Sequence, residues 1–433
     1  MHGVLNFLQD FYLNSTKIVG MNKKSISWAL YDWANSVFFT TVMAGFFPIF
    51  FKQYWNTDTA VNLSTQRLST VLGISGFCLA LVAPFLGALS DYRKVKKNFL
   101  FVFMVMGVTA NAFLFLVPQG DWFFAACLYG LAFFCCSASC IFNDAMLVSV
   151  AEPKDYDKVS SLGYSLGYLG GGILFTINVL MFQKPEWFGF ESGTEGIKYS
   201  FLTVSIWWFL FSLPTLINVP EPEAKPSSEN LLQIFKKTIT ELKKTVKELF
   251  QQKNIFYFIV AYWFYIDGVS TIMSMAVDFG ISIGFAASDL IKALLLTQFV
   301  GFPAAYLSGY LASRFGTKVI INLCLLVYVF VVIGASYMKT STDFYIMATL
   351  IGLSQGGVQA LSRSLFASLI PIEKSGEYFG FFNLLGKFAA VLGPFLVAFS
   401  SIVFEQPQKT FLSLLILFGF GIYFLNKVKV VRQ

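Results

Sequence analysis

The sequence predicts an all-α polytopic membrane protein, with twelve transmembrane helices in two pseudo-symmetric six-helix bundles. Hydrophobic residues make up 56% of the 433 positions and charged residues only 13%, which is about half of the charged fraction of a typical soluble domain. Twelve apolar runs are each long enough to cross a bilayer, which takes about 20 residues of helix. A long polar interval after the sixth run divides them into two sets of six.

Polar breaks separate the twelve expected spans and define the domain organisation. The spans run over approximately 26–51, 68–90, 98–118, 122–149, 159–182, 200–219, 254–279, 289–312, 318–338, 343–367, 376–402 and 409–426. They form an expected N-terminal bundle at 26–219 and a C-terminal bundle at 254–426, followed by a cytoplasmic tail at 427–433. Residues 1–25 are an extension whose apolar residues fit a short interfacial helix. Its first twenty residues are dispensable if the chain starts at Met21.

The interval 220–253 is expected to be a cytoplasmic linker with an amphipathic helix. It opens with a Pro-Glu-Pro-Glu run and continues with five lysines between 236 and 247. Over about 229–250, apolar residues recur at helical spacing, which favours a helix that lies on the membrane surface and joins the two bundles.

The basic residues predict how the chain is oriented. One side of the membrane is assigned 22 Lys and Arg residues and the other side six, with three more inside spans. Because cytoplasmic loops carry the excess of Lys and Arg, both termini and the linker are expected in the cytoplasm. The membrane is expected to be a bacterial cytoplasmic (inner) membrane, or an organelle membrane if the source is eukaryotic.

The loops after the second and the eighth span share a pattern. The first reads Gly-Ala-Leu-Ser-Asp-Tyr-Arg-Lys from Gly87, and the second reads Gly-Tyr-Leu-Ala-Ser-Arg-Phe-Gly-Thr-Lys from Gly309. The pattern resembles the Gly-x-Leu-x-Asp-Arg-x-Gly-Arg signature of the major facilitator superfamily. The resemblance implies that Asp91 is part of a cytoplasmic gate and contacts a helix N-terminus in the other bundle, where a carboxylate is favoured. The second copy has Ser313 in place of the acid.

Five further stretches are similar to the vacuolar-effluxer-like branch of that superfamily. They read Tyr-Asp-Trp-Ala-Asn-Ser from Tyr31, Phe-Asn-Asp-Ala from Phe142, Ser-Ser-Leu-Gly-Tyr-Ser-Leu-Gly-Tyr-Leu-Gly-Gly from Ser160, Gly-Gly-Val-Gln-Ala-Leu-Ser-Arg-Ser from Gly356, and Tyr-Phe-Gly-Phe from Tyr378. They fall in spans 1, 4, 5, 10 and 11, so the resemblance covers the chain. It implies a major facilitator fold and amino acids as the first guess for the cargo, although one fold carries many cargoes.

Ionisable residues inside spans are functional candidates, because a charge in the bilayer costs several kcal/mol unless it faces a cavity or a partner. Asp144 lies nine residues before Pro153, and Arg363 lies eight residues before Pro371. These equivalent positions in the two halves predict an ion pair that closes the cytoplasmic side and breaks when the protein opens inward. The alternative is that each charge pairs inside its own half or extends to the interface.

Three other charges have open alternatives. An Asp follows a Trp by four residues at Asp32 and again at Asp267. Asp32 is the proton-coupling candidate, or else it accepts hydrogen bonds from neighbours such as Asn35. Asp267 and Lys387 either neutralise each other or bind the amine and the carboxylate of a zwitterionic cargo.

Neutral polar and aromatic side chains complete the expected cargo site. The candidates are Gln355, Gln359, Asn383, Asn143, Tyr164 and Tyr168. Interhelical packing is the alternative for each of them. Gly163, Gly167 and Gly171 recur every four residues in span 5, which favours close packing against another helix.

Several classes of function are excluded by what the sequence lacks. His2 is the only histidine, and no Cys/His spacing is typical of a zinc site, so no metal and no cofactor are expected. There is no phosphate-binding Gly-x-x-x-x-Gly-Lys loop, no nucleophile–base constellation of an enzyme, and no basic patch for nucleic acid.

The sequence therefore predicts a monomeric secondary or facilitative transporter that moves a small polar or zwitterionic metabolite by alternating access. Its partners are the solute, the lipid bilayer and, if transport is coupled, protons. A proton-coupled drug or metabolite exporter is the first alternative. A non-transporting membrane sensor on the same fold is the second, and it predicts that neutralising Asp32, Asp267 and Lys387 leaves function intact.

Overall fold

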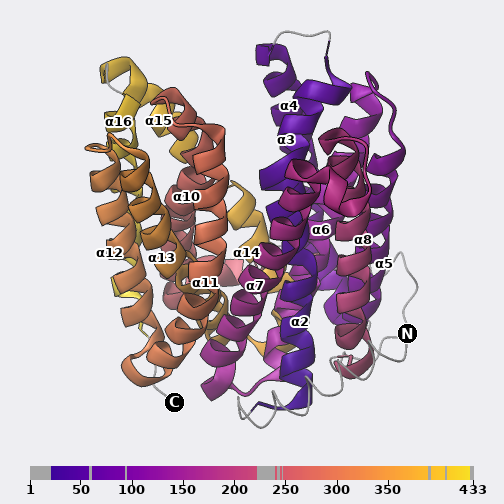
Figure 1. Cartoon of the computed structure of the whole chain (residues 1–433). Coiled ribbons are helices and arrows are strands. Elements are labelled where there is room, and N and C mark those ends of the chain that lie inside the picture. The colour runs from indigo at the N-terminus through magenta and orange to yellow at the C-terminus, as the bar shows by residue number, and fades with distance from the viewer. Residues whose placement is uncertain are drawn as a thin grey trace.

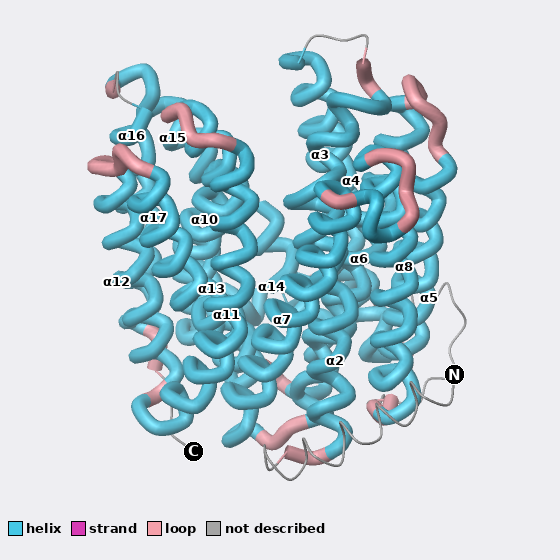
Figure 2. The backbone as a smooth tube through the Cα atoms, viewed as in Figure 1, coloured by secondary structure: helices cyan, strands magenta, loops and turns pink. Residues whose placement is uncertain are grey.

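The chain forms two helical bundles that stand side by side (Figures 1 and 2). A computed structural model describes residues 21–57, 61–92, 95–221, 239–240, 244–245, 247–388, 392–404 and 407–429. Within these ranges the regular structure is helical throughout, without a strand. Eleven of the helices are long and apolar enough to cross a membrane. The expectation of an all-α polytopic fold is confirmed.

The first bundle contains the first six spans. Its helices are α2 (Lys23–Val37), α3 (Phe47–Phe50), α4 (Val61–Tyr92), α5 (Lys96–Phe113), α6 (Trp122–Val150), α7 (Tyr156–Gln183) and α8 (Gly193–Asn218). Span 1 is continuous over Lys23–Trp55, but it widens to a π-helix at Phe38–Phe46 and again at Phe51–Trp55. Pro48 lies between these segments, and a proline inside a helix removes one backbone donor and clashes with the preceding turn.

The second bundle contains the remaining spans. Its helices are α10 (Lys253–Ser282), α11 (Ala287–Phe315), α12 (Thr317–Ala335), α13 (Ser341–Leu369), α14 (Ser375–Phe388), α15 (Leu392–Val403), α16 (Pro407–Thr410) and α17 (Leu415–Lys427). The expected span at 376–402 is described as two helices, α14 and α15, and residues 389–391 between them lie outside the described ranges. Neither helix reaches the length of about 20 residues that a span needs, which is why eleven long helices are found where twelve spans were expected.

The linker expected at 220–253 falls mostly outside the described residues, so its amphipathic helix stays a prediction. Lys374 ties it to the second bundle, because its Nζ lies 2.9 Å from Oε2 of Glu248 and donates to Oγ1 of Thr245 at 3.5 Å. The N-terminal extension at 1–20 and most of the C-terminal tail also lie outside the described ranges.

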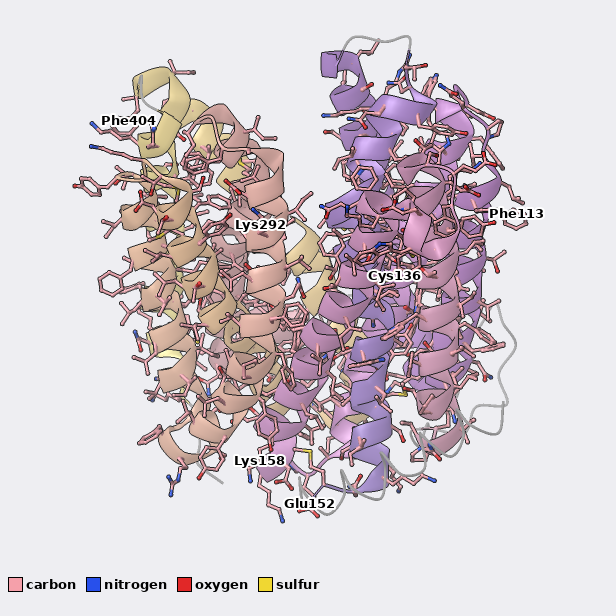
Figure 3. All side chains as sticks on the ribbon, in the orientation of Figure 1. Phe113, Cys136, Glu152, Lys158, Lys292 and Phe404 are labelled. Atoms are coloured by element: carbon pink, nitrogen blue, oxygen red, sulfur yellow. The ribbon has the colours of Figure 1, made fainter. Side chains whose placement is uncertain are left out.

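Successive spans run in opposite directions, so each long helix has one end on either side of the molecule. The helix ends that carry Lys and Arg lie on the same side. We call this the basic end, defined by Lys23, Lys96, Lys158, Arg314 and Lys427. Figure 3 shows Lys158 there, next to Glu152. The far end of the bundles is called the opposite end, and toward it the ribbons of the two bundles diverge (Figure 1).

The bundles meet mainly along two helix pairs, α4 with α14 and α7 with α11, and α7 also contacts α13 while α6 contacts α14. Figure 1 shows α7 and α11 next to each other at the boundary between the bundles. Glycines allow the backbones to approach closely, as in other membrane helix pairs. A Cβ added to Gly87 would lie 2.1 Å from the carbonyl oxygen of Gly376, and one added to Gly309 would lie 2.5 Å from Cβ of Ser161. The contact between the bundles therefore depends on these glycines.

Gly87→Ala is expected to weaken the contact between the bundles, because the new methyl group would overlap the backbone of α14. The variant should unfold at a lower temperature in detergent and show faster amide hydrogen exchange at the start of α14. Gly76→Ala on the same helix is the matched control, since no atom lies within 4 Å of the position of its added Cβ. Equal behaviour of the two variants would contradict the role of Gly87.

Candidate functional site

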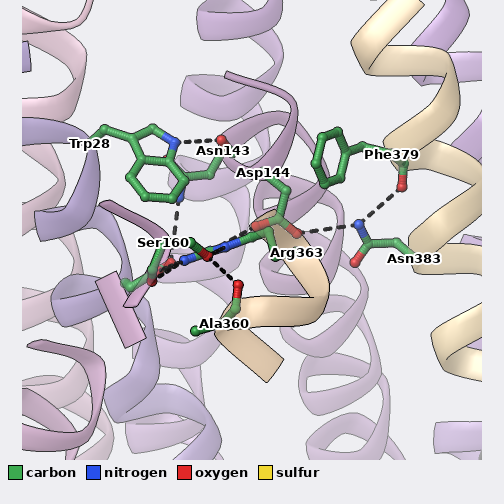
Figure 4. Close-up of polar contacts among 9 residues, drawn as sticks. Trp28, Asn143, Asp144, Ser160, Ala360, Arg363, Phe379 and Asn383 are labelled. Carbon is green, nitrogen blue, oxygen red and sulfur yellow. Dashed lines mark hydrogen bonds and ion pairs between the residues drawn. The ribbon is translucent and has the colours of Figure 1, made fainter. Parts of the chain in front are cut away.

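The candidate site is an ion cluster around Arg363, in the part of α13 that is nearer the basic end (Figure 4). Nη1 of Arg363 donates to Oδ1 of Asp144 at 2.9 Å, and Nη2 donates to Oδ2 of Asp32, also at 2.9 Å. The arginine side chain is only 2% exposed. The structure thus brings together an arginine of the second bundle and two carboxylates of the first, from α2 and α6.

Further contacts of Arg363 come from α7 and from aromatic rings of the first bundle. Nε donates to Oγ of Ser160 at 2.8 Å, and Nη2 also donates to the carbonyl oxygen of the same serine at 3.0 Å. The guanidinium carbon lies 4.6 Å from the ring centroid of Trp28 and 4.5 Å from that of Tyr164. A cation over an aromatic face is stabilised by the negative face of the ring.

Two amides extend the cluster. Nδ2 of Asn143 donates to Oδ1 of Asp32, and Nδ2 of Asn383 on α14 donates to Oδ2 of Asp144, both at 3.4 Å. The cluster therefore includes Asn143 and Asn383 together with the three charges. With both carboxylates ionised, the cluster has two negative charges and one positive charge, so its net charge is −1.

The end of α4 makes a second connection between the bundles. Asp91 accepts hydrogen bonds from the backbone N–H groups of Gly376 at 3.0 Å and Glu377 at 2.8 Å, in the first turn of α14. Its carboxylate also lies 2.7 Å from Nζ of Lys96, which in turn donates to Ser375 at 2.9 Å. The acid thus lies at the positive end of a helix of the other bundle, where negative charge is favoured.

The pseudo-equivalent end of α11 lacks an acid. Ser313, which stands in place of the acid, donates to the carbonyl oxygen of Tyr310 in its own helix. The carboxylate is supplied instead by Asp157 in the first turn of α7. It accepts from Oγ1 of Thr317 at 2.7 Å, where α12 begins, and from the hydroxyl of Ser364. Asp157 therefore contributes a second carboxylate contact between the bundles.

The glycines of α7 make room for a polar face of α2. A Cβ added to Gly163 would lie 2.3 Å from Oδ2 of Asp32, and one added to Gly167 would lie 2.5 Å from Oγ of Ser36. One turn further on, a Cβ added to Gly171 would lie 2.8 Å from Oγ1 of Thr40. These three glycines let Asp32 come close enough to α7 to contact Arg363.

The other predicted site residues lie on the helices around the cluster. Gln355, Gln359 and Arg363 occupy successive turns of α13 and so share one face. Oε1 of Gln355 is buried without a hydrogen-bond partner among the described residues, whereas Gln359 is half-buried. Tyr168 packs between α11 and α13, close to Gly301 and Gly356.

Asp267 lies in a different environment from Asp32. Both of its carboxylate oxygens accept from the backbone N–H of Gly393, at 3.1 and 3.0 Å, and Thr271 donates to Oδ1 at 3.4 Å. The buried acid thus caps the beginning of α15.

The side chain of Lys387, the proposed partner of Asp267, lies outside what the structure describes. For Asp32, the sequence offered Asn35 as a donor, but Nδ2 of Asn35 has no partner among the described residues, and Asn143 donates instead.

The described hydrogen bonds and ion pairs that join the two bundles lie between the basic end and the middle of the helices. They are the contacts of Asp91, Lys96, Asp144, Asp32, Asp157, Ser160 and Ser165 with α11, α12, α13 and α14. In the structure, the bundles are therefore held together at the basic end.

Comparison with known proteins identifies the family. The family model described as "Vacuole effluxer Atg22 like" matches residues 21–156 and 148–433. The uncharacterized MFS-type transporter YxiO of Bacillus subtilis is 36% identical over 93% of this chain and 94% of its own length. The chain belongs to the vacuole effluxer Atg22-like family.

More distant relatives agree with this assignment. Autophagy-related protein 22 of the yeast Vanderwaltozyma polyspora is 23% identical to this Atg22-like chain, over 86% of the chain and 84% of its own length. The crystal structure of the human organic anion transporter MFSD10 superposes with a TM-score of 0.69, at 14% identity, and covers 93% of this chain and 99% of that one. The Atg22-like chain thus has the major facilitator fold and is a multi-pass membrane transporter rather than an enzyme.

Sequence reasoning about this Atg22-like chain missed two residues of the cluster, Trp28 and Ser160, and the separate contact made by Asp157. Trp28 was noted only for its spacing from Asp32, and Ser160 only as part of a family motif. Asp157 was not considered, because it lies at the edge of a span where a carboxylate is ordinary. Only the packing of α2 and α7 against the second bundle shows that these groups contact it.

Gly163→Ala is expected to separate Asp32 from Arg363, since the new methyl group would lie 2.3 Å from Oδ2 of Asp32 and 3.0 Å from Nη2 of Arg363. Transport by reconstituted protein should fall at least about tenfold. A tenfold change corresponds to a free energy of about 1.4 kcal/mol. Gly73→Ala is the control, because its added Cβ meets no atom within 4 Å. Unchanged transport in Gly163→Ala would show that this spacing does not matter.

Asp267→Ala is expected to destabilise the protein by about 1–3 kcal/mol, because the N–H of Gly393 would lose its acceptor in a buried position. Asp267→Asn should be milder, since an amide oxygen can still accept from Gly393. Thermal unfolding in detergent measures both. If Asp267→Ala unfolds like the wild type and loses only transport, the capping role is wrong and a direct role in cargo binding is favoured.

Proposed function

We propose that the chain is a secondary or facilitative transporter that moves a small polar or zwitterionic metabolite by alternating access, with amino acids as the first class to test. The observation that carries the proposal is the Arg363 cluster. It joins the two bundles at the basic end through buried charges, and such contacts must break if the bundles part there. In transporters built from two pseudo-symmetric halves, access alternates by rocking of one half against the other.

The orientation follows from the charges. The basic end carries the excess of Lys and Arg and is assigned to the cytoplasm by the positive-inside rule, which also places both termini there. The relative from Bacillus subtilis supports a bacterial cytoplasmic membrane. In this assignment the structure is closed toward the cytoplasm, and Asp144, Arg363 and Asp91 belong to the cytoplasmic gate.

The cargo would pass between the polar faces that begin at the gate and continue toward the middle of the helices. On α13 this face carries Gln359 and Gln355, and in span 1 it carries Ser36 of α2 and Thr40 of the π-helical segment that follows. Tyr168 lies between the bundles at a similar depth. These groups form hydrogen bonds with a polar solute without fixing its charge. Lys387, if it faces the same path, would bind a carboxylate.

Asp32 is the proposed proton site. When Arg363 withdraws, two carboxylates lose their guanidinium inside the bilayer, where an uncompensated charge costs several kcal/mol. Protonation of one carboxylate would remove part of this cost and so couple opening of the basic end to proton binding. Asp32 has the slightly more exposed side chain of the two, 14% against 12% for Asp144.

Transport by purified protein in proteoliposomes tests the function. We expect saturable uptake and counterflow for at least one labelled amino acid, measured with and without an imposed proton gradient. Arg363→Ala should reduce both activities, because the gate loses its ion pairs. Asp32→Asn should abolish gradient-driven accumulation but keep counterflow, and Lys387→Ala should lose counterflow if the cargo carboxylate binds there.

Lys292→Ala is the control for loss of a positive charge, since this exposed lysine of α11 pairs only with Asp289 among the described residues. If no amino acid moves under any condition, the amino-acid assignment is wrong. If the protein has a measurable cellular function that survives neutralisation of Asp32, Asp267 and Lys387, the sensor alternative is favoured.

A further inference from the structure

The groups that hold Arg363 form one site that belongs almost entirely to the first bundle. Trp28 and Asp32 come from α2, Asp144 from α6, and Ser160 and Tyr164 from α7. We call these five residues the cation socket. The second bundle supplies the guanidinium that fills it, so the socket and its occupant separate when the bundles separate.

The shape of the socket depends on contacts inside the first bundle. Nε1 of Trp28 donates to the carbonyl oxygen of Asn143 at 2.6 Å, and the amide of Asn143 donates to Asp32 at 3.4 Å. The helices themselves are tied together nearby, because Ser25 of α2 donates to the carbonyl oxygen of Val150 in α6 at 2.7 Å. None of these bonds involves α13. These bonds therefore persist when Arg363 leaves, whereas the bond from Ser160 to the carbonyl oxygen of Ala360 on α13 and the bond from Asn383 on α14 to Asp144 are lost with it.

Two features show that the internal guanidinium does not saturate the socket. The two carboxylates exceed the one positive charge of Arg363. In addition, Oδ1 of Asn143 is fully buried without a donor among the described residues, although the same amide donates to Asp32 inside the socket. A buried acceptor without a donor is uncommon in native structures, and it marks a position that a further N–H group would satisfy.

An empty socket would be costly. Two carboxylates of the bilayer interior would face each other across the space that the guanidinium vacated, with neither its charge nor its donors. The chemistry that restores the lost contacts is a cation that donates to both carboxylates and lies on the faces of Trp28 and Tyr164. A guanidinium does this best, because it is planar and its donors form a fixed fork, whereas an ammonium is a compact point charge.

We propose that, in the state open at the basic end, the cation socket binds the cationic group of the cargo in the place of Arg363, with guanidinium preferred over ammonium. This inference rests on the proposed function that the chain moves a small solute, and it adds the charge class of that solute. Cargo and Arg363 occupy the socket in turn. Return of Arg363 closes the basic end and expels the cationic group from the socket.

The test is binding of free guanidinium to the full-length Arg363→Ala variant, measured as a shift in Tm in lipid nanodiscs against sodium chloride of equal ionic strength. The variant keeps both carboxylates and vacates the socket. We expect guanidinium at millimolar concentration to raise Tm by a few degrees, as a ligand that binds only the folded state does, and methylammonium to raise it less.

Matched variants separate binding in the socket from a general salt effect. The rise should be absent in the wild type, in which Arg363 fills the socket, and in Lys292→Ala, which loses an exposed charge elsewhere. It should be at least about tenfold weaker in affinity in the double variant Arg363→Ala with Asp144→Asn, which removes one of the two charges that hold the cation. A folded Arg363→Ala variant that shows no rise, or an equal rise in the double variant, would overturn the proposal.

A second measurement applies to the wild type and remains available if Arg363→Ala does not fold. Guanidinium at high concentration should compete with Arg363 and so favour opening of the basic end. Amide hydrogen exchange at the starts of α7 and α14 should then be faster than in sodium chloride of equal ionic strength. Unchanged exchange in both helices would overturn the proposal.

These measurements do not require transport, so they are independent of the proposed function. Binding of guanidinium without transport of any amino acid would contradict the amino-acid assignment and leave the socket intact. Transport of neutral amino acids by a protein whose socket does not respond to guanidinium would uphold the function and contradict the socket.

Discussion

The rest of the structure depends on the need to neutralise Arg363. A guanidinium that is 2% exposed inside a membrane bundle needs opposite charge and hydrogen-bond acceptors, because neither water nor lipid can supply them there. Asp32, Asp144 and Ser160 supply both, and they belong to the other half of the molecule. The contacts that neutralise Arg363 are therefore also contacts that hold the two bundles together. A change that weakens them affects both the burial of the arginine and the contact between the bundles.

Close approach of the backbones makes this pairing possible. Short acidic side chains reach an arginine across a helix interface only if the helices are close, and the glycines of α7 and α4 provide that distance. The same glycines bring backbone against backbone across the interface, as at Gly87 and Gly376. Such an interface is held by a small number of polar bonds and by backbone contact, which suits two bodies that part and rejoin more than a permanent, interdigitated core does.

The contacts of Asp91 and Asp157 with the second bundle show how a pseudo-symmetric fold tolerates asymmetry in its sequence. On one side, Asp91 in the last turn of α4 caps α14 of the second bundle. On the other side, the loop has lost its acid, and Asp157 at the start of α7 bonds to Thr317 where α12 begins. In both cases a carboxylate of the first bundle lies at the beginning of a helix of the second. The polarity of the interface is the same on both sides, although the symmetry of the sequence predicts opposite polarities.

The sequence by itself determined the membrane character, the approximate helix boundaries, the family and the fact that Asp32, Asp144, Asp267 and Arg363 required partners. These properties are local, since hydropathy, loop charge and short motifs are read from neighbouring residues. Tertiary structure alone decided which partners were chosen: Asp32 and Asp144 share one arginine, whereas Asp267 caps α15. The pairing of groups that are more than a hundred residues apart depends on which helix faces meet. The combined packing of all the helices sets those faces, and no single stretch of sequence encodes it.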